Sequence, residues 1–504
     1  MSAPPTAADP NDRLRLERVR PPDWRNPAPA ARYNLVVLGG GTAGLVAAAG
    51  AAGLGARVAL VERGLLGGDC LNTGCVPSKA LLASARAVAD ARAAGRIGVR
   101  IDSPGPDFGA AMARMRKVRA EIAIHDSAAR FRDLGVDVFL GEGRFVSGDA
   151  IEVEGARLCF ARALIATGAR PAVPAVPGLA EAGFLTSETV FDLTALPARM
   201  AVLGGGPLGC ELAQAFARFG SRVVLIEVED RLLPAEDADA AEIVGQSLAA
   251  DGVEHALVTR LIRVDRTATD LRLALDGPSG RRCVEADAIL VSVGRAPTVA
   301  GLGLEAAGVA LDEKGAILTD DRLRTTNRRI YAAGDVVGGQ QFTHLADAHA
   351  RIVIRNALFP GSAKASALTI PWCTFTDPEI ARVGHGLKSA AAAGLRTRAF
   401  VQPFDAVDRA RLEGESTGFA RVLVKKGGDE IVGATIVGRH AGEAISMVTL
   451  TIQAGIGLTD LASVIHPYPT RAQALGAIAD QYQRTRLGPR YRRVLERWMA
   501  WRRR

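Results

Sequence analysis

Apolar residues along this chain gather in short runs that alternate with glycine-rich turns and alanine-rich segments. The runs Asn34–Leu38 and Arg57–Val61 flank one such turn and segment, and residues 200–203 and 223–226 flank a second. A short apolar run bounded by turn residues is typical of a buried strand, and strand, helix and strand in this order form a βαβ unit. The pattern therefore predicts an α/β fold with two separate parallel sheets.

Each βαβ unit carries the pattern Gly-x-Gly-x-x-Gly in its turn and an acid at the end of its second strand. The residues are Gly39, Gly41, Gly44 and Glu62 in the first unit, and Gly204, Gly206, Gly209 and Glu227 in the second. Such glycines let a pyrophosphate approach the helix N-terminus, and the acid binds ribose hydroxyls. Two fingerprints predict two dinucleotides, and Glu227, which would repel a 2′-phosphate, favours NAD(H) over NADP(H).

Apolar residues at helical spacing predict helices over 78–94 and 107–133, whereas 135–165 and 258–290 alternate as strands do. From Ile370 a mixture of strands and helices predicts a third, α+β domain. The resulting divisions are an extended N-terminal arm (1–30), a first dinucleotide-binding domain (31–184, resuming at 298–366), a second such domain (185–297), the α+β domain (367–485) and a basic amphipathic tail (486–504).

Two cysteines, Cys70 and Cys75, lie close behind the first βαβ unit in the stretch Gly67–Lys79. Five residues of helix rise roughly 7.5 Å, whereas a disulfide needs Cα atoms about 4.4–6.8 Å apart. The chain must therefore bend between them, and we expect a helix to open at Pro77 and Ser78. A thiol at a helix start is a better nucleophile, so the stretch predicts a redox-active dithiol. A structural disulfide or two unpaired buried cysteines are the alternatives.

The four remaining cysteines lie in apolar surroundings, where we expect small buried hydrophobic side chains, with substrate contact as an alternative for the last. They are Cys159, Cys210, Cys283 and Cys373. Six cysteines in 504 residues are too few for a disulfide scaffold and suit a reducing compartment, so we expect a cytoplasmic protein. We find no N-terminal signal peptide, and the uncharged stretch 33–56 holds seven glycines, which is typical of a nucleotide-binding unit rather than a membrane span.

The net charge of +8 is confined to one end of the chain. Between Arg484 and Arg504 there are nine arginines and one glutamate, which account for the whole excess. The body is therefore neutral, and we expect no nucleic-acid partner. Apolar residues at helical spacing opposite these arginines predict a helix that either docks on the body, stays solvated, or contacts an acidic membrane surface.

Five motifs in this order make the chain resemble the flavoprotein pyridine nucleotide–disulfide oxidoreductases, and mercuric reductase-like members above all. They are Gly39–Gly44 with Glu62, Gly67–Lys79, Ala166–Gly168, Gly204–Gly209 with Glu227, and Ala333–Asp335. The resemblance implies FAD on the first fingerprint and on Lys79, Thr167, Gly168, Gly334 and Asp335. It implies a nicotinamide nucleotide on the second fingerprint and Gly294, and a homodimer formed through the third domain.

The resemblance also implies a course of reaction. Electrons would pass from the nicotinamide through the flavin to a Cys70–Cys75 disulfide. Cys75 would be the thiolate beside the flavin, Cys70 the outer thiol that attacks the substrate, and Lys79 would lie near the flavin. The protein would supply positioning and electrostatics for this chemistry.

The chain departs from the disulfide-reducing members near its C-terminus, where they carry a catalytic His and a Glu. Here these positions are Tyr468 and Gln473, which are poor groups for proton transfer at pH 7, although His466 could substitute. Mercuric reductases also carry Tyr there, so we expect a small-molecule or metal-ion acceptor such as Hg(II), held transiently by Cys70 and Cys75 without a structural metal site. A dihydrolipoamide dehydrogenase-type enzyme and a non-enzymatic, membrane-associated redox sensor are the alternatives.

Overall fold

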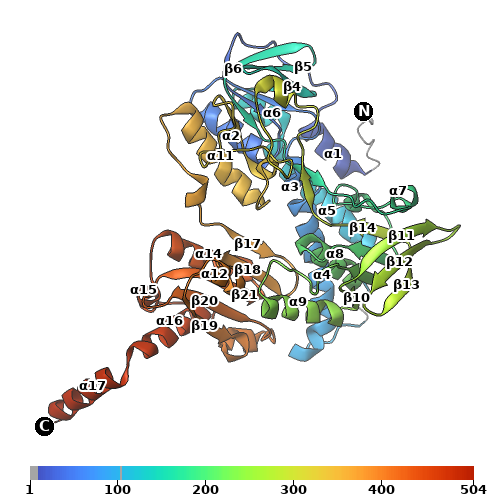
Figure 1. The fold of residues 1–504 in the computed structure, drawn as a ribbon. Coiled ribbons are helices and arrows are strands. Elements are labelled where there is room, and N and C mark those ends of the chain that lie inside the picture. The colour runs from blue at the N-terminus through green and yellow to red at the C-terminus, as the bar shows by residue number, and fades with distance from the viewer. Residues whose placement is uncertain (1–8, 103–104, 504) are drawn as a thin grey trace.

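The computed structural model describes residues 9–102 and 105–503, and its first sheet has the strand order β3-β2-β1-β6-β5-β4, with β16 paired to β6 (Figure 1). The strands are β1 (Tyr33–Leu38), β2 (Val58–Glu62), β3 (Val136–Leu140), β4 (Gly143–Ser147), β5 (Ala150–Val153), β6 (Ala156–Ile165) and β16 (Ile330–Ala332). The helices α2 (Thr42–Gly53) and α11 (Thr343–Leu358) pack together against this sheet. Because β16 joins beside β6, the first domain is built from two stretches of the chain.

The second sheet is four-stranded and parallel, in the order β10-β9-β8-β14. Its strands are β8 (Arg199–Leu203), β9 (Arg222–Ile226), β10 (Val253–Ala256) and β14 (Ala288–Val291). The helices α8 (Pro207–Phe219) and α9 (Ala238–Ala250) follow β8 and β9. An antiparallel sheet completes the domain and consists of β11 (Arg260–Arg266), β12 (Leu271–Gly277) and β13 (Gly280–Ala286). The chain passes twice between the two domains, and the two connecting segments pair with each other as the antiparallel strands β7 (Ala169–Pro171) and β15 (Arg295–Pro297).

The third domain is a five-stranded antiparallel sheet in the order β17-β18-β21-β20-β19. Its strands are β17 (Pro371–Thr374), β18 (Glu379–Gly384), β19 (Thr397–Pro403), β20 (Phe419–Lys425) and β21 (Ile431–Gly438). The helices α14 (Ala441–Gln453) and α16 (Gln473–Arg486) contribute to its core. The predicted α/β fold, with two Rossmann-like domains and a C-terminal α+β domain, is confirmed.

The prediction of an extended arm at residues 1–30 is wrong for residues 10–19, which form the helix α1 (Pro10–Val19). Asp9 caps this helix by accepting a hydrogen bond from the Asn11 N–H (2.8 Å), and Pro10 occupies the first turn. The helix packs against α5 (Phe108–Ile122) and buries two charged side chains, Asp12 and Arg15, together with Val19. Residues 1–8 lie outside the described residues.

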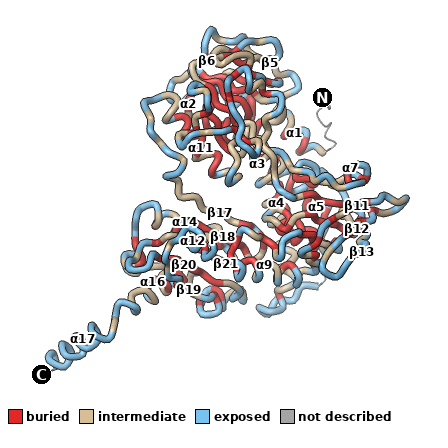
Figure 2. The backbone as a smooth tube through the Cα atoms, viewed as in Figure 1, coloured by how far each residue is buried: buried red, intermediate tan, exposed pale blue. Residues whose placement is uncertain are grey.

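Two further predictions change in detail. The helix expected over 107–133 is divided, because α5 ends at Ile122 and Ser127 caps a new helix, α6 (Ala128–Asp133). The tail forms the helix α17 (Pro489–Arg502), which extends away from the body and has no buried residue (Figures 1 and 2). Among the residues that the structure describes, no helix is long and apolar enough to cross a membrane.

Candidate active site

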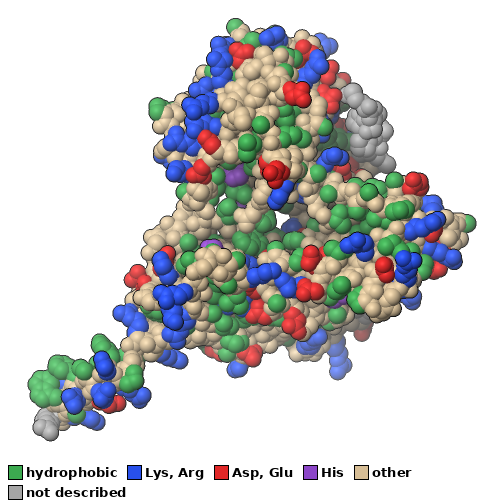
Figure 3. Space-filling view, in the orientation of Figure 1, with side chains coloured by type: hydrophobic (Ala, Val, Ile, Leu, Met, Phe, Trp, Pro, Cys, Tyr) green, Lys and Arg blue, Asp and Glu red, His purple; other side chains and the backbone are tan. Residues whose placement is uncertain are grey.

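A cavity of about 1670 Å³ lies between the two dinucleotide-type domains and the third domain, where Figure 3 shows the molecule hollowed. Both glycine-rich turns and both cysteines of the Gly67–Lys79 stretch line it. The predicted site residues in its wall are Gly39, Gly41, Glu62, Cys70, Cys75, Lys79, Thr167, Gly168, Gly204, Gly206, Glu227, Gly294, Gly334 and Asp335. Gly44, Gly209 and Tyr468 are outside the wall.

The third glycine of each turn acts by packing instead of by contact with the cavity. A Cβ on Gly44 would lie 1.8 Å from the carbonyl oxygen of Gly39, and a Cβ on Gly209 would lie 2.0 Å from that of Gly204. Only glycine lets each helix start so close to its strand. The first glycines have φ values of +111° and +100°, which a side chain would strain.

The two acids at the strand ends hold their own turns in the same way. Glu62 Oε2 accepts a hydrogen bond from the Gly40 N–H, and Glu227 Oε2 accepts one from the Gly205 N–H, both at 2.6 Å. Burial raises the pKa of Glu62, although the backbone hydrogen bonds from Gly40 and Gly64 oppose that shift. The two glycine-rich turns and their strand-end acids therefore have the same local structure in both domains.

The residues present fit two dinucleotides. The N-cap residues of α2 and α8 are Gly41 and Gly206, which give no side-chain cap, so the N–H groups at these helix N-termini remain available for phosphate oxygens. At the strand ends, Asp335 lies 3.7 Å from the Nε of Arg295, and burial raises the pKa of its carboxyl. Thr167 donates a hydrogen bond to the Thr298 carbonyl (2.7 Å), which ties the two chain crossings together.

The dithiol loop bends as predicted, but its helix starts earlier. A short helix, α3 (Gly68–Asn72), carries Cys70. Thr73 and Gly74 are not helical, and α4 (Cys75–Ala93) begins at Cys75 itself. The expected start at Pro77 and Ser78 is therefore wrong, because Gly74 supplies the non-helical conformation needed before the first turn. This places the Cys75 thiol at a helix N-terminus, where a thiolate is favoured.

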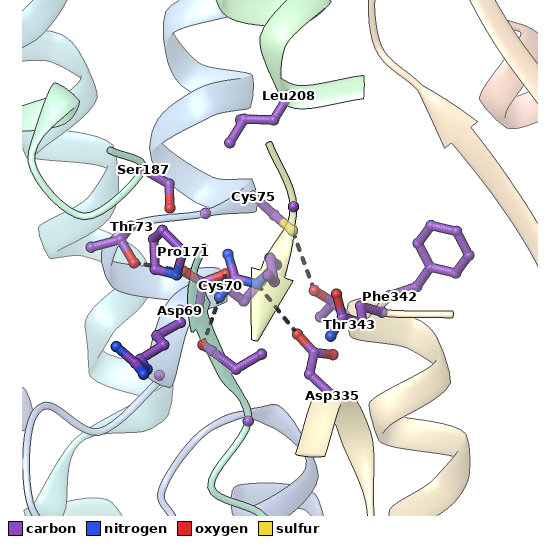
Figure 4. Close-up of a pocket in the computed structure, with 18 of the residues that line it drawn as sticks. Asp69, Cys70, Thr73, Cys75, Pro171, Ser187, Leu208, Asp335, Phe342 and Thr343 are labelled. Atoms are coloured by element: carbon purple, nitrogen blue, oxygen red, sulfur yellow. Dashed lines mark hydrogen bonds and ion pairs between the residues drawn. The ribbon is translucent and has the colours of Figure 1, made fainter. Parts of the chain in front are cut away.

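The pKa values of the two thiols are shifted in opposite directions. The side-chain hydrogen bond from Cys70 lowers the pKa of Cys75 to about 6 against the effect of burial, and Thr343 and Lys79 contribute in the same direction. The same hydrogen bond raises the pKa of Cys70. Cys75 Sγ lies 3.2 Å from Thr343 Oγ1 at the start of α11 (Figure 4). Cys75 is therefore the thiolate of the pair, and Cys70 remains a thiol.

Lys79 follows one turn after Cys75 on α4 and joins two domains. Its Nζ donates to Glu211 Oε2 on α8 (2.7 Å) and lies 4.7 Å from the ring centre of Phe375. Burial favours the neutral amine, but the charge and hydrogen bond of Glu211, followed by the thiol of Cys75, raise the pKa of Lys79. The result is a fixed cation beside the thiolate.

Tyr468 is remote from the dithiol of its own chain. It is 69% exposed and donates a hydrogen bond to Asp408 Oδ2 (3.2 Å), which raises the pKa of its phenol. Of the other cysteines, Cys210 is buried as expected and Cys373 lines the cavity, whereas Cys283 on β13 is exposed. The described residues contain no group of three or more His, Cys, Asp or Glu side chains that could hold a metal ion.

The cavity wall also contains residues that were not predicted, and four of them belong to or contact the dithiol loop or α4. They are Asp69, Glu211, Arg295 and Thr343, which line the cavity beside the dithiol. Arg295 lies 3.3 Å from Asp69 and so links the dithiol loop to Asp335. Arg295 and Asp69 adjoin the predicted Gly294 and Cys70, so proximity in sequence could have indicated them. Thr343 and Glu211 reach the dithiol loop and α4 from 268 and 132 residues away, respectively, and nothing in the sequence signals that contact.

Comparison with known proteins agrees with this geometry. The model of the pyridine nucleotide-disulphide oxidoreductase family matches residues 33–350, and that of its dimerisation domain matches 370–478. The mercuric reductase of Staphylococcus aureus is 35% identical over 447 residues, which cover 88% of this chain and 81% of the relative. The dihydrolipoyl dehydrogenase of Chlamydia muridarum is also 35% identical over 447 residues, covering 88% and 95%.

Solved structures give the same result. The HOCl-induced flavoprotein disulfide reductase RclA of Escherichia coli, in a Cu(II) complex, is 29% identical with a TM-score of 0.80 and covers 90% of this chain and 100% of its own. LpdA of Mycobacterium tuberculosis is 29% identical with a TM-score of 0.81 and the same coverage. The chain therefore belongs to the pyridine nucleotide–disulfide oxidoreductase family of FAD-dependent enzymes.

Proposed function

We propose that this protein is an NAD(P)H oxidoreductase that delivers electrons through the Cys70–Cys75 pair to a soft metal ion such as Hg(II). The observation that carries the proposal is the position of Cys75, a thiolate with a pKa of about 6, in a cavity shared by both dinucleotide turns. No His or Glu stands at the positions used for acid–base chemistry by the disulfide-reducing members, since these are Tyr468 and Gln473.

FAD, when bound on the first turn, would supply the electron transfer between the nicotinamide and the sulfur pair. The chain's own residues prepare the thiols for it. The hydrogen bond from Cys70, with Thr343 and Lys79, holds Cys75 as a thiolate, and Cys70 keeps its proton until an acceptor is bound. Glu211 fixes Lys79 in place. We further propose NADH as the donor, because Glu227 occupies the end of β9, where a 2′-phosphate would meet its charge.

A soft metal ion suits this pair better than a disulfide does. A soft metal ion passes readily from one thiolate ligand to another, and this ligand exchange needs no general acid. Reduction of one Hg(II) to Hg(0) takes the two electrons of one nicotinamide. A relative of known structure, RclA, forms a Cu(II) complex, which supports a metal ion as acceptor. The equal identity to dihydrolipoyl dehydrogenases leaves lipoamide as the second candidate.

We propose that the protein acts as a homodimer formed through the third domain, in which Tyr468 reaches the dithiol cavity of the second copy. In its own chain Tyr468 is exposed and outside the cavity wall. The match to a dimerisation domain over 370–478 supports this arrangement.

The test is oxidation of NADH and NADPH by the FAD-loaded protein with a panel of acceptors. The panel contains Hg(II) with excess thiol, Cu(II), lipoamide, glutathione disulfide and a quinone. We expect turnover of Hg(II) with NADH, lost by roughly 10³-fold or more in Cys75→Ala and Cys70→Ala. Cys283→Ser removes an exposed thiol on β13, outside the cavity, and serves as the matched control.

Other outcomes would contradict the proposal. Faster turnover of lipoamide than of Hg(II), unchanged by Tyr468→Phe, would assign the protein to the dihydrolipoamide dehydrogenase type. Turnover that survives Cys75→Ala would remove the dithiol from the electron path. Absence of turnover with every acceptor would favour a redox sensor.

A further inference from the structure

The N-terminal helix α1 contacts the loop that joins the two cysteines. Arg15 Nη1 donates a hydrogen bond to Asn72 Oδ1 at 2.5 Å, and Asn72 lies between Cys70 and Cys75 in sequence. Both residues are buried, with 6% and 5% of their surface exposed. The Asn72 amide nitrogen donates to the carbonyls of Leu66 (3.0 Å) and Gly68 (2.8 Å). Arg15 therefore completes the set of hydrogen bonds that orients this side chain.

The contact is fixed from its other side by α5. Arg119 donates through Nη1 to the Asn72 carbonyl (2.7 Å) and through Nη2 to Asp12 Oδ1 on α1 (2.5 Å). Asp12 also pairs with Arg116 (3.2 Å) and with Arg15 (3.5 Å). One carboxylate thus joins three arginines, and two of those arginines hold the backbone or the side chain of Asn72. Buried ionic networks of this kind fix geometry because each partner is costly to leave unpaired.

We propose that Arg15 is a positioning residue that sets the dithiol–disulfide equilibrium of Cys70 and Cys75 through Asn72. The bend between the cysteines determines how often the two sulfur atoms meet, and Asn72 ties that bend to Leu66 and Gly68. Loss of Arg15 leaves Asn72 Oδ1 without its donor and loosens the bend, which lowers the effective concentration of one thiol at the other and so favours the reduced form. This inference rests on the proposed function, because it requires a reversible Cys70–Cys75 disulfide.

The experiment equilibrates the full-length, FAD-loaded protein anaerobically in glutathione buffers and traps the thiols by acid and alkylation. Two glutathione thiols supply two electrons and two protons to the disulfide, which gives the dithiol and one glutathione disulfide. Mass spectrometry measures the oxidised fraction. We expect Arg15→Met to shift the equilibrium about tenfold towards the dithiol, which corresponds to about 30 mV. Arg15→Lys, which keeps the charge and one donor, should stay within about threefold of the wild type.

Arg18→Met is the matched control. Arg18 stands on the same helix and donates a hydrogen bond of similar length, but to the Ala120 carbonyl on α5 (2.6 Å), so its loss should leave the equilibrium within about twofold. Asn72→Ala removes the acceptor together with the hydrogen bonds to Leu66 and Gly68, so its shift should be at least as large. Adding Arg15→Met to Asn72→Ala should shift the equilibrium no further, because the bond between the two side chains is already lost.

Each result has a defined consequence. If the wild type forms no disulfide in oxidising buffer, both the proposed function and this inference fail. If it forms one and Asn72→Ala and Arg15→Met stay within twofold, only the positioning role fails. If Arg15→Met does not fold, Asn72→Ala decides the question, because it leaves all three arginines paired with Asp12.

The C-terminal helix α17 carries a second, independent observation. Its apolar residues lie on one side and all but the half-buried Leu495 are exposed, among them Trp501 at 65% and Tyr491 at 58%. The members of this stripe are Tyr491, Val494, Leu495, Trp498, Met499 and Trp501. Arginines dominate the rest of the described helix, with Glu496 as the single acid between Pro489 and Arg503. Figure 3 shows this mixture of hydrophobic and basic side chains on the projecting tail.

We infer that α17 lies in the headgroup layer of an anionic lipid bilayer. Its cationic residues match anionic headgroups in charge, and the tryptophans Trp498 and Trp501, whose ring centres are 5.2 Å apart, match the boundary between headgroups and acyl chains. A nucleic acid would pair with the arginines but leave most of the apolar stripe in water. Docking on its own body is not the observed arrangement, since none of the residues described for α17 is buried.

Sedimentation with vesicles tests this inference. The full-length protein should bind vesicles containing phosphatidylserine at least about tenfold better than pure phosphatidylcholine vesicles, and added salt should weaken binding. Trp498→Ser/Trp501→Ser and Arg492→Glu/Arg493→Glu should each abolish the preference, whereas Arg144→Glu, at an exposed position of β4 on the body, should not. No binding by the wild type, or binding that survives deletion of residues 488–504, would overturn it.

Discussion

The helices α1 and α17 lie at opposite ends of the chain, and both fall outside residues 33–350 and 370–478 that the family models match. Both are rich in arginine and begin with proline in the first turn. In α1 the buried residues are Asp12, Arg15 and Val19, whereas α17 buries none and exposes its tryptophans. A similar arginine-rich composition is therefore partly buried in α1 and not buried in α17.

The difference lies in what each helix meets. α1 finds buried arginines of α5 and the polar backbone of the dithiol loop, so its charges are paired inside the protein. Among residues 9–102 and 105–503, α17 has no such partners, and the ion pair recorded on it there, Arg492 with Glu496 at 3.5 Å, is in solvent. Charged groups can be buried only where partners are already in place, which makes α1 part of the catalytic domain and α17 an appendage.

Removing the shared carboxylate of α1 should have the largest effect. Asp12→Ala leaves Arg15, Arg116 and Arg119 without their common partner and should lower the free energy of unfolding by about 3–5 kcal/mol. The measurement is urea unfolding followed by far-UV circular dichroism. The same change in the other helix, Glu496→Ala, breaks a solvent-exposed pair and should stay within about 0.5 kcal/mol. Equal losses in both variants would refute the distinction between the two helices.

The contrast between buried and exposed cations extends to the thiolate. Lys79→Met removes the cation beside Cys75 and should lower the rate of iodoacetamide alkylation of Cys75 in the reduced protein at pH 7 by about twofold, because the rate follows the thiolate fraction. Arg497→Met in α17 should change nothing. A Lys79→Met rate equal to that of the wild type would show that Lys79 does not control the thiolate.

The rate of Cys75 alkylation should fall as the pH is lowered, because the thiolate becomes protonated. The folded pKa of Cys75, about 6, lies below its ordinary value of 9.0. The thiolate therefore stabilises the reduced fold fully above pH 9, and this contribution is lost as the pH falls towards 6. In the wild type the alkylation rate should be flat near neutrality and fall about tenfold per pH unit below 6, whereas Lys79→Met should move the midpoint upward.

The same contrast explains how much the sequence could predict. The turns at Gly39–Gly44 and Gly204–Gly209 were predictable because their requirements are local, namely strand, glycines, helix and a terminal acid. The role of Asn72 was not, because its partners Arg15 and Arg119 come from 57 and 47 residues away. Buried arginines of α1 and exposed arginines of α17 look the same in a sequence. Cys283 likewise sits in an apolar strand pattern, yet it lies on an exposed strand.

The helix caps should differ in the same way, on a smaller scale. Asp9→Ala removes the hydrogen bond to the Asn11 N–H and should cost about 1 kcal/mol in unfolding, because α1 unfolds together with the body it packs against. Gly488→Asp would add a cap to α17, whose N-cap Gly488 has no side chain. It should increase helicity without raising the stability of the body. A measurable gain in the urea midpoint would mean that α17 does pack on the protein.

Deleting residues 488–504 should have the smallest effect on the fold and sharpens the comparison furthest. The described part of α17 contributes no buried residue. The truncated protein should therefore keep its free energy of unfolding within about 0.5 kcal/mol of the full-length value. Its FAD content and its glutathione equilibrium should be unchanged. Its net charge falls, since most of the excess arginines are removed, so its affinity for anionic surfaces should fall as well. A deletion at the other end, of residues 1–19, removes Asp12 and Arg15 and should destabilise the dithiol loop. If the C-terminal deletion proved as damaging as the N-terminal one, α17 would have to pack on the protein in solution, and its apolar stripe would be an internal contact.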